Sequence, residues 1–192
     1  MSEQTTTTAA HAGELHRGPG EEFWLEGDAD VKPLVIRQGV VAYRRGSVAI
    51  GLMGPGEVVL PIPGTPKLGP AAADLVAVTE ATVGEYEGDL ESNKYQACLD
   101  SARAVVEGAD RLGNMSLPQR LAALLLDITD MTGQPVVGCR QDILAMAAAA
   151  RRETVATILS GWRDEDWIQT RYRRCKVMDR DALIKIRDRR PE

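Results

Sequence analysis

The sequence changes its pattern near residue 90, and this change limits the fold to two parts of different kinds. Between about Glu22 and Glu87, short runs rich in Val and Ile alternate with turns that contain Gly and Pro, such as RRG, GPG and PGTP. Such runs predict a small antiparallel sandwich or roll. From about Leu90, apolar residues recur at steps of three and four, which predicts helices. We therefore expect an α+β chain.

The composition adds boundaries to this division. The first 20 residues are rich in Thr, Ala and Gly without periodicity, and predict a flexible lead that contains both histidines, His11 and His16. After this lead we expect a β-roll domain, a long helix and a C-terminal helical domain, with boundaries at 21–89, 90–115 and 116–192. In the last of these, Ser116 is a candidate N-cap and Gly133 a candidate stop for the first helix.

Charge is distributed unevenly along the chain. The formal net charge is −5, but residues 1–110 carry −9 and residues 111–192 carry +4. A basic C-terminal part can bind a polyanion such as nucleic acid. No apolar run reaches the roughly 18 residues that span a membrane, and the N-terminus lacks the apolar core of a secretory signal. We expect a cytoplasmic protein without a membrane partner.

The residues that usually bind metals or perform catalysis are sparse. Cys98, Cys139 and Cys175 lie far apart and form no Cys-x-x-Cys pair, so we expect reduced, buried thiols and no bound metal or iron–sulfur cluster. Both histidines fall in the predicted lead, and no Gly-rich phosphate loop precedes a helix. The sequence therefore predicts no enzyme and no cofactor.

The long helix carries a lean apolar stripe with two possible uses. Its members recur at steps of three and four: Leu99, Ala102, Val105 or Val106, Ala109 and Leu112. The stripe can pack on its own domain or pair with a second copy of the chain in a dimer. The spacing alone does not distinguish these arrangements.

The stretch RRETVATILSGW, residues 151–162, predicts a helix with two distinct faces. Its apolar stripe is Val155, Ile158, Leu159 and Trp162. The opposite face combines long polar groups in the first turn, Arg152 and Glu153, with the smaller Ala156, Thr157 and Ser160 behind them. Small residues let a helix approach a surface closely, so this face suits binding rather than simple solvation.

A short helix and a basic hairpin flank this stretch. In RQDILAMA, residues 140–147, Ile143, Met146 and Ala147 can pack on the apolar stripe and complete a helix-turn-helix. The second helix would then enter the DNA major groove, where arginine matches guanine and glutamate accepts from cytosine. In the hairpin WIQTRYRRCKVM we expect phosphate contacts from Arg171, Arg173, Arg174 and Lys176.

Residues 116–183 resemble the DNA-binding domain of the catabolite activator/fumarate–nitrate regulator (CRP/FNR) superfamily. The resemblance rests on LPQRLAALLLDI and on RQDI followed by RRETV and IL. It implies a homodimer with a cyclic-nucleotide-binding-like β-roll, a dimerisation helix and a winged helix-turn-helix. It further implies a transcription activator that binds a palindromic TGTGA-like site in double-stranded DNA and contacts RNA polymerase.

The resemblance also implies roles for single residues. Arg152 and Glu153 correspond to the base-reading pair, and phosphate contacts fall to Arg140, Arg151 and Thr154. Thr157 stands where catabolite-activator-like members have a further base-reading arginine, so one base position is expected to be read less strictly. Ala148 stands where the turn usually has glycine, which predicts a strained turn if its φ is positive.

The front half departs from members that bind a cyclic nucleotide. Gly56 and Glu57 are kept, but Ala71, Ala72 and Ala73 stand where an arginine and a hydroxyl would hold the phosphate. An uncompensated phosphate would bind poorly there, so we expect no cyclic AMP or GMP. The alternative hypothesis is a winged-helix module that contacts protein or RNA without specific DNA readout.

Overall fold

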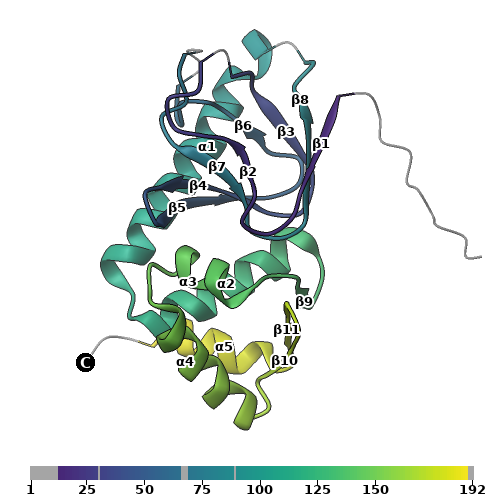
Figure 1. The fold of residues 1–192 in the computed structure, drawn as a ribbon. Coiled ribbons are helices and arrows are strands. Elements are labelled where there is room, and N and C mark those ends of the chain that lie inside the picture. The colour runs from purple at the N-terminus through teal and green to yellow at the C-terminus, as the bar shows by residue number, and fades with distance from the viewer. Residues whose placement is uncertain (1–12, 30, 66–68, 89, 190–192) are drawn as a thin grey trace, which may run out of the picture.

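A computed structural model describes residues 13–29, 31–65, 69–88 and 90–189, and it shows a β-rich part followed by a helical part (Figure 1). The α+β prediction is therefore confirmed. The β-rich part contains eight strands: β1 (Glu14–Arg17), β2 (Glu22–Trp24), β3 (Leu34–Gln38), β4 (Val41–Arg45), β5 (Val48–Met53), β6 (Val58–Val59), β7 (Asp74–Ala77) and β8 (Ala81–Glu85). They form two four-stranded antiparallel sheets, in the orders β1-β8-β3-β6 and β2-β7-β4-β5.

Five helices and a small sheet make up the rest of the described chain. The helices are α1 (Leu90–Asn114), α2 (Leu117–Thr132), α3 (Gln141–Ala147), α4 (Arg152–Asp164) and α5 (Arg180–Arg187). The small sheet has the order β10-β11-β9, with strands β9 (Val136–Val137), β10 (Ile168–Arg171) and β11 (Arg174–Val177). Helix α1 runs along the roll, and the remaining helices gather below it (Figure 1).

Strand β1 corrects the prediction of a flexible lead over residues 1–20. Residues 14–17 pair with β8 in antiparallel register, and the Nδ1 atom of His16 lies 2.8 Å from the Thr82 hydroxyl. This strand contains one apolar residue, Leu15, so it lacks the alternation that identifies a strand in a sequence. Residues 1–12, including His11, lie outside the described residues.

The interior of the roll is filled by large side chains from both sheets. Trp24, Tyr43, Met53 and Leu75 are buried there. The Tyr43 hydroxyl donates to the Leu60 carbonyl at 2.8 Å and accepts from the Leu60 N–H at 3.0 Å. Burial raises the pKa of Tyr43 well above its ordinary value. The hydroxyl is thus fully satisfied, and the roll closes around an ordered polar contact.

Helix α1 lies almost backbone to backbone on strand β5. A Cβ added at Gly108 would lie 2.3 Å from the carbonyl oxygen of Ile50, and one added at Gly51 would lie 2.8 Å from the Ala104 carbonyl carbon. No side chain larger than hydrogen fits at either position without a shift of the helix. The two glycines therefore set the distance between α1 and the roll.

Helix α2 begins and ends at the predicted residues. Ser116 is the N-cap, and its N–H donates to the Gln119 side chain at 2.9 Å. The amide nitrogen of Gln119 reaches the carbonyl oxygens of Arg187 and Arg189, which fixes the end of α5 against the start of α2. Gly133 ends the helix in the left-handed conformation.

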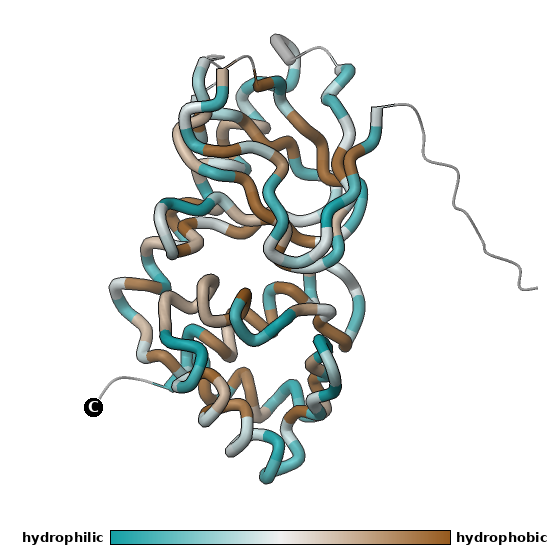
Figure 2. Tube along the Cα trace, viewed as in Figure 1, coloured by the Kyte–Doolittle hydropathy of each residue, from teal (hydrophilic) through white to brown (hydrophobic). Residues whose placement is uncertain are grey.

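One apolar core connects the roll to the helical part. It joins Leu125 and Ile128 of α2 with Leu144 of α3, and reaches the lower face of the roll at Val40, Ala42, Leu52 and Val76. Figure 2 shows the hydrophobic segments at this junction. Within the described ranges, no helix has both the length and the apolar character needed to cross a bilayer.

Candidate nucleic-acid interface

Helices α3 and α4 form the predicted two-helix unit. Ile143 is buried, and Met146 and Ala147 are partly buried against the same core. On α4, Val155 and Leu159 are buried and Ile158 is partly buried, while Trp162 closes the stripe at 6% exposure. The predicted apolar stripe is thus confirmed, and it fixes which face of α4 points away from the protein.

The turn between the two helices corrects one prediction. Ala148 has an ordinary φ of −91°, whereas the following residue, Ala149, has a φ of +50°. The left-handed residue is therefore one position later than expected. The turn is held by hydrogen bonds from the N–H groups of Ala149 and Ala150 to the carbonyls of Met146 and Ala145, at 3.2 and 2.9 Å.

The outward face of α4 presents its polar side chains without internal partners. Arg152 and Glu153 are exposed in the first turn, and neither is bound to another described side chain. Thr157 is exposed one turn later, where its hydroxyl donates to the Glu153 carbonyl at 3.0 Å. A guanidinium and a carboxylate are thus held side by side on a rigid helix and remain free to bind a ligand.

The start of α4 also offers donors to an anion. The N-cap, Arg151, has extended backbone angles and makes no side-chain capping bond. The first-turn N–H groups therefore remain available, with the positive end of the helix dipole behind them. Arg151 and Thr154 are both exposed at this end.

Strands β10 and β11 form the predicted basic hairpin beside α4. Their register pairs Arg171 with Arg174 and Gln169 with Lys176. Cys175 is buried, and because side chains alternate between the two faces of a strand, Arg174 and Lys176 point outward. Arg171 lies on the same outward face. None of these three cations has an ion-pair partner among the described residues.

A groove of about 400 Å³ separates the hairpin from α4. Five arginine side chains line it: Arg140, Arg152, Arg171, Arg173 and Arg174. Asp142 is the one acidic residue among the lining residues described. This concentration of cations in an otherwise acidic protein is suited to a polyanion.

Arg140 differs from the other predicted phosphate ligands. Its Nε and Nη2 atoms donate to the two carboxylate oxygens of Asp142, at 3.0 and 2.6 Å. This bidentate contact raises the pKa of Arg140 and lowers that of Asp142. A phosphate would have to share or displace this partner.

One exposed residue at this interface was not predicted from the sequence. Tyr172 is 82% exposed at the tip of the hairpin, and the guanidinium of Arg173 lies 5.0 Å from the centre of its ring. The stretch RYRR in the sequence could have drawn attention to it, because arginines on both sides of a ring are typical of a surface position.

All three cysteines are free thiols, and two of the three are buried as expected. Cys139 and Cys175 are buried beneath the groove. Burial raises the pKa of Cys139 and raises the pKa of Cys175 to about 12, so both thiols are protonated near neutral pH. Cys98 on α1 is only partly buried. Across the described residues, no three His, Cys, Asp or Glu side chains gather to hold a metal ion.

The apolar stripe predicted on α1 divides between two faces. Leu99 and Val106 are 64% and 66% exposed. Ala102 lies between them along the helix and Ala109 lies one turn beyond Val106, all on the outward face in line with the exposed Tyr95. Val105 instead packs on the interior of the roll, and Leu112 lines a small void against β5. Four of the six predicted residues are therefore available to another molecule.

Comparison with known proteins agrees with this geometry. Residues 119–186 match the model of the Crp-like helix-turn-helix domain. No curated protein sequence gives a significant match to the chain.

Several solved structures have the same overall fold. A CRP family transcriptional regulator from Thermus thermophilus aligns with a TM-score of 0.73 at 22% identity, over 93% of this chain and 98% of its own. A second regulator from the same organism, of the CRP/FNR family, aligns with a TM-score of 0.66 at 19% identity, over 93% of this chain and 100% of its own. FixK2 from Bradyrhizobium japonicum aligns with a TM-score of 0.70 at 16% identity, over 90% of this chain and 96% of its own. These likenesses establish the shared fold.

Proposed function

We propose that the chain is a DNA-binding transcription regulator of the CRP/FNR family, because residues 119–186 match the Crp-like helix-turn-helix domain. We also propose that it binds a palindromic DNA site as a homodimer without a cyclic nucleotide. Such regulators are not enzymes. We further propose that the bound dimer activates transcription by contact with RNA polymerase, as the resemblance to catabolite activators implies.

The observation that carries the proposal is the free pair Arg152 and Glu153 on the outward face of α4. In the major groove, the arginine fork matches O6 and N7 of guanine, and the carboxylate accepts from N4 of cytosine. Neither side chain must break an internal bond to reach a base. Thr157 offers a shorter side chain and is expected to read its base pair less strictly.

The flanking cations supply the contacts that position the protein. Arg171, Arg174 and Lys176 face outward without internal partners and are placed to neutralise phosphates, together with Arg151 and Thr154 at the start of α4. Arg140 can also contact a phosphate once its guanidinium shares its hydrogen bonds between Asp142 and that phosphate. Such contacts set register and affinity, while α4 sets sequence preference.

A homodimer would bring two copies of α4 to one DNA duplex. The outward stripe of α1, from Tyr95 to Ala109, exposes apolar side chains at alternating steps of four and three, which is the spacing of a coiled-coil seam. With the two-fold axis along this seam, the half-sites lie about one helical turn apart, in a palindrome of about 20 bp.

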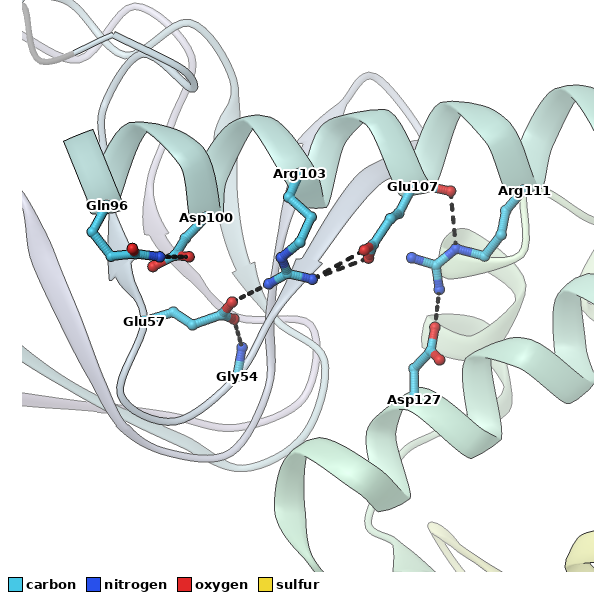
Figure 3. A network of polar contacts seen from close by, with 8 residues as sticks. All are labelled: Gly54, Glu57, Gln96, Asp100, Arg103, Glu107, Arg111 and Asp127. Carbon is cyan, nitrogen blue, oxygen red and sulfur yellow. Dashed lines mark hydrogen bonds and ion pairs between the residues drawn. The ribbon is translucent and has the colours of Figure 1, made fainter. Parts of the chain in front are cut away.

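The contacts of Glu57 support action without a cyclic nucleotide. Its carboxylate accepts from the Gly54 N–H at 2.6 Å and from the guanidinium of Arg103 on α1 (Figure 3). Ala71 and Ala73 are buried and apolar where a phosphate would need donors. The carboxylate of Glu57 is thus already paired with Arg103, and this ion pair connects α1 to the roll.

Selection of bound sequences from random duplexes, with no small molecule added, tests the proposal. We expect a two-fold symmetric motif related to TGTGA. Arg152→Ala and Glu153→Ala should each weaken the selected site by about tenfold to a hundredfold relative to random DNA, the effect of losing a bidentate base contact. Transcription of a template with this site, with and without the protein, then tests activation.

Arg163→Ala is the matched control. Arg163 lies on the same helix, but its guanidinium binds Ser160 and Asp164 at the far end. This variant should keep the discrimination of the wild type. Equal losses on specific and random DNA for Arg152→Ala would instead favour a module that contacts protein or RNA.

A further inference from the structure

A small void lies where the β-roll meets three helices, away from the DNA interface. Its volume is about 10 Å³, which is roughly the space that one water-sized particle needs. Strand β5 contributes Ala49 to its lining, α1 contributes Arg111, α2 contributes Arg120, and α3 contributes Ala147. A ligand in this void would therefore contact the roll and the helical part at once.

The charged residues that line the void are of one sign. They are Arg111 and Arg120, and the described lining residues include no carboxylate. The remaining lining residues are glycine or apolar. A guanidinium donates hydrogen bonds and accepts none, so the side chains around the void offer donors without an acceptor.

Arg120 has an unused donor in this position. Its Nε atom is buried and has no hydrogen-bond partner among the described residues. Its Nη1 atom donates to the Leu112 carbonyl over a long distance of 3.5 Å. A buried donor on a cation is costly when it has no acceptor. This arginine therefore favours a ligand that accepts hydrogen bonds.

The neighbouring ion pair leaves one positive charge over. Arg111 donates through Nη1 to Asp127 at 2.5 Å and through Nε to the Glu107 carbonyl at 3.4 Å (Figure 3). Asp127 thus balances one of the two guanidinium groups. Arg120 has no ion-pair partner within the described ranges, so the surroundings of the void carry one uncompensated positive charge.

We propose that this void binds one monatomic anion, chloride, between the guanidinium groups of Arg111 and Arg120. Chloride accepts hydrogen bonds only, which matches the donors. A water molecule has the right size, but its own hydrogens would face these donors and find no side-chain acceptor. Phosphate and sulfate are too large for the void. The bound anion would supply the missing negative charge and stabilise the contact between the roll and the helices.

Thermal unfolding of the full chain without DNA tests the proposal, in sodium chloride and in sodium gluconate at equal ionic strength. We expect the wild-type midpoint to be about 3 °C higher in saturating chloride. Arg120→Met removes the charge and the Nε donor but keeps an unbranched side chain, and it should abolish this difference. Crystals grown in bromide should show an anomalous scattering peak in the void.

Two further variants separate this site from general effects of salt. Arg163→Met is the matched control, since it removes an arginine whose guanidinium binds Ser160 and Asp164 on α4, and it should keep the chloride difference. Ala49→Val leaves both arginines in place but adds two methyl groups to the lining, and it should abolish the difference by filling the void.

Equal wild-type midpoints in the two salts would overturn the proposal. A chloride difference that persists in Ala49→Val, or bromide crystals without a peak in the void, would overturn it as well, the latter by indicating water only. If Arg120→Met does not fold, Ala49→Val and the bromide peak decide. No DNA enters these measurements, so their failure leaves the proposed function unaffected.

Discussion

At the scale of single residues, the turn between α3 and α4 illustrates how backbone angles decide what a substitution does. Ala149 has a positive φ, and its neighbour Ala148 does not. An alanine in the left-handed conformation carries a steric cost of about 1–2 kcal/mol that glycine avoids. Glycine in return loses about 0.5–1 kcal/mol through the greater freedom of its unfolded chain.

We therefore expect opposite effects at the two positions. Ala149→Gly should raise the free energy of unfolding by about 0.5 kcal/mol, and Ala148→Gly should lower it by about 1 kcal/mol. Urea denaturation followed by circular dichroism measures both. A stabilising Ala148→Gly with a destabilising Ala149→Gly would contradict the assigned angles.

The sequence was sufficient to predict the face that holds Arg152 and Glu153, because helical periodicity around Val155 and Leu159 leaves a single outward direction. It was not sufficient to locate the left-handed residue, since family spacing fixes a turn only to within a residue. The exposure of Tyr172 depends on the pairing of Arg171 with Arg174, which a sequence does not specify.

At the scale of elements, α1 shows the limits of periodicity. Steps of three and four cannot separate Val105 from Val106, because each lies three or four residues from both Ala102 and Ala109. Val105 packs toward the roll and Val106 toward solvent. Strand β1 was missed for a related reason: its place is set by pairing with β8, a contact distant in sequence.

The close approach of α1 and β5 gives a prediction about their contact. Gly108→Ala would place a methyl group against the Ile50 carbonyl, so the helix must move away, and we expect a loss of about 2 kcal/mol in unfolding free energy. Gly161→Ala is the control. A Cβ there meets no atom within 4 Å, and helix propensity predicts a gain of about 0.5–1 kcal/mol. A neutral Gly108→Ala in equilibrium denaturation would show that the helix is not held against the strand.

At the scale of the whole molecule, the charged contacts and the apolar stripe belong to different sides of α1. Figure 3 shows the charged side: Arg103 bridges Glu57 and Glu107, and Arg111 reaches Asp127 of α2 at 2.5 Å. Burial raises the pKa values of Glu57 and Asp127, and the neighbouring arginines oppose this rise. The same helix is thus bonded to both the roll and the helical part.

The apolar side leads to a prediction about assembly. Leu99→Glu places a charge in the proposed seam, and we expect a folded monomer in sedimentation velocity that has lost tight binding to the palindrome. Gln96→Glu adds a charge to the same helix outside the stripe and should remain a dimer. A wild-type monomer, or a dimer that tolerates Leu99→Glu, would contradict the proposed seam.

The apolar core shared by the roll and the helices has a consequence for dissecting the protein. Val40, Ala42 and Leu52 cover side chains of the helical part. A fragment that begins near Ser116 would expose this surface to water and would need new cover to stay soluble. The β-roll and the helical part therefore depend on each other for folding, and a truncated protein is a poor way to study either part alone.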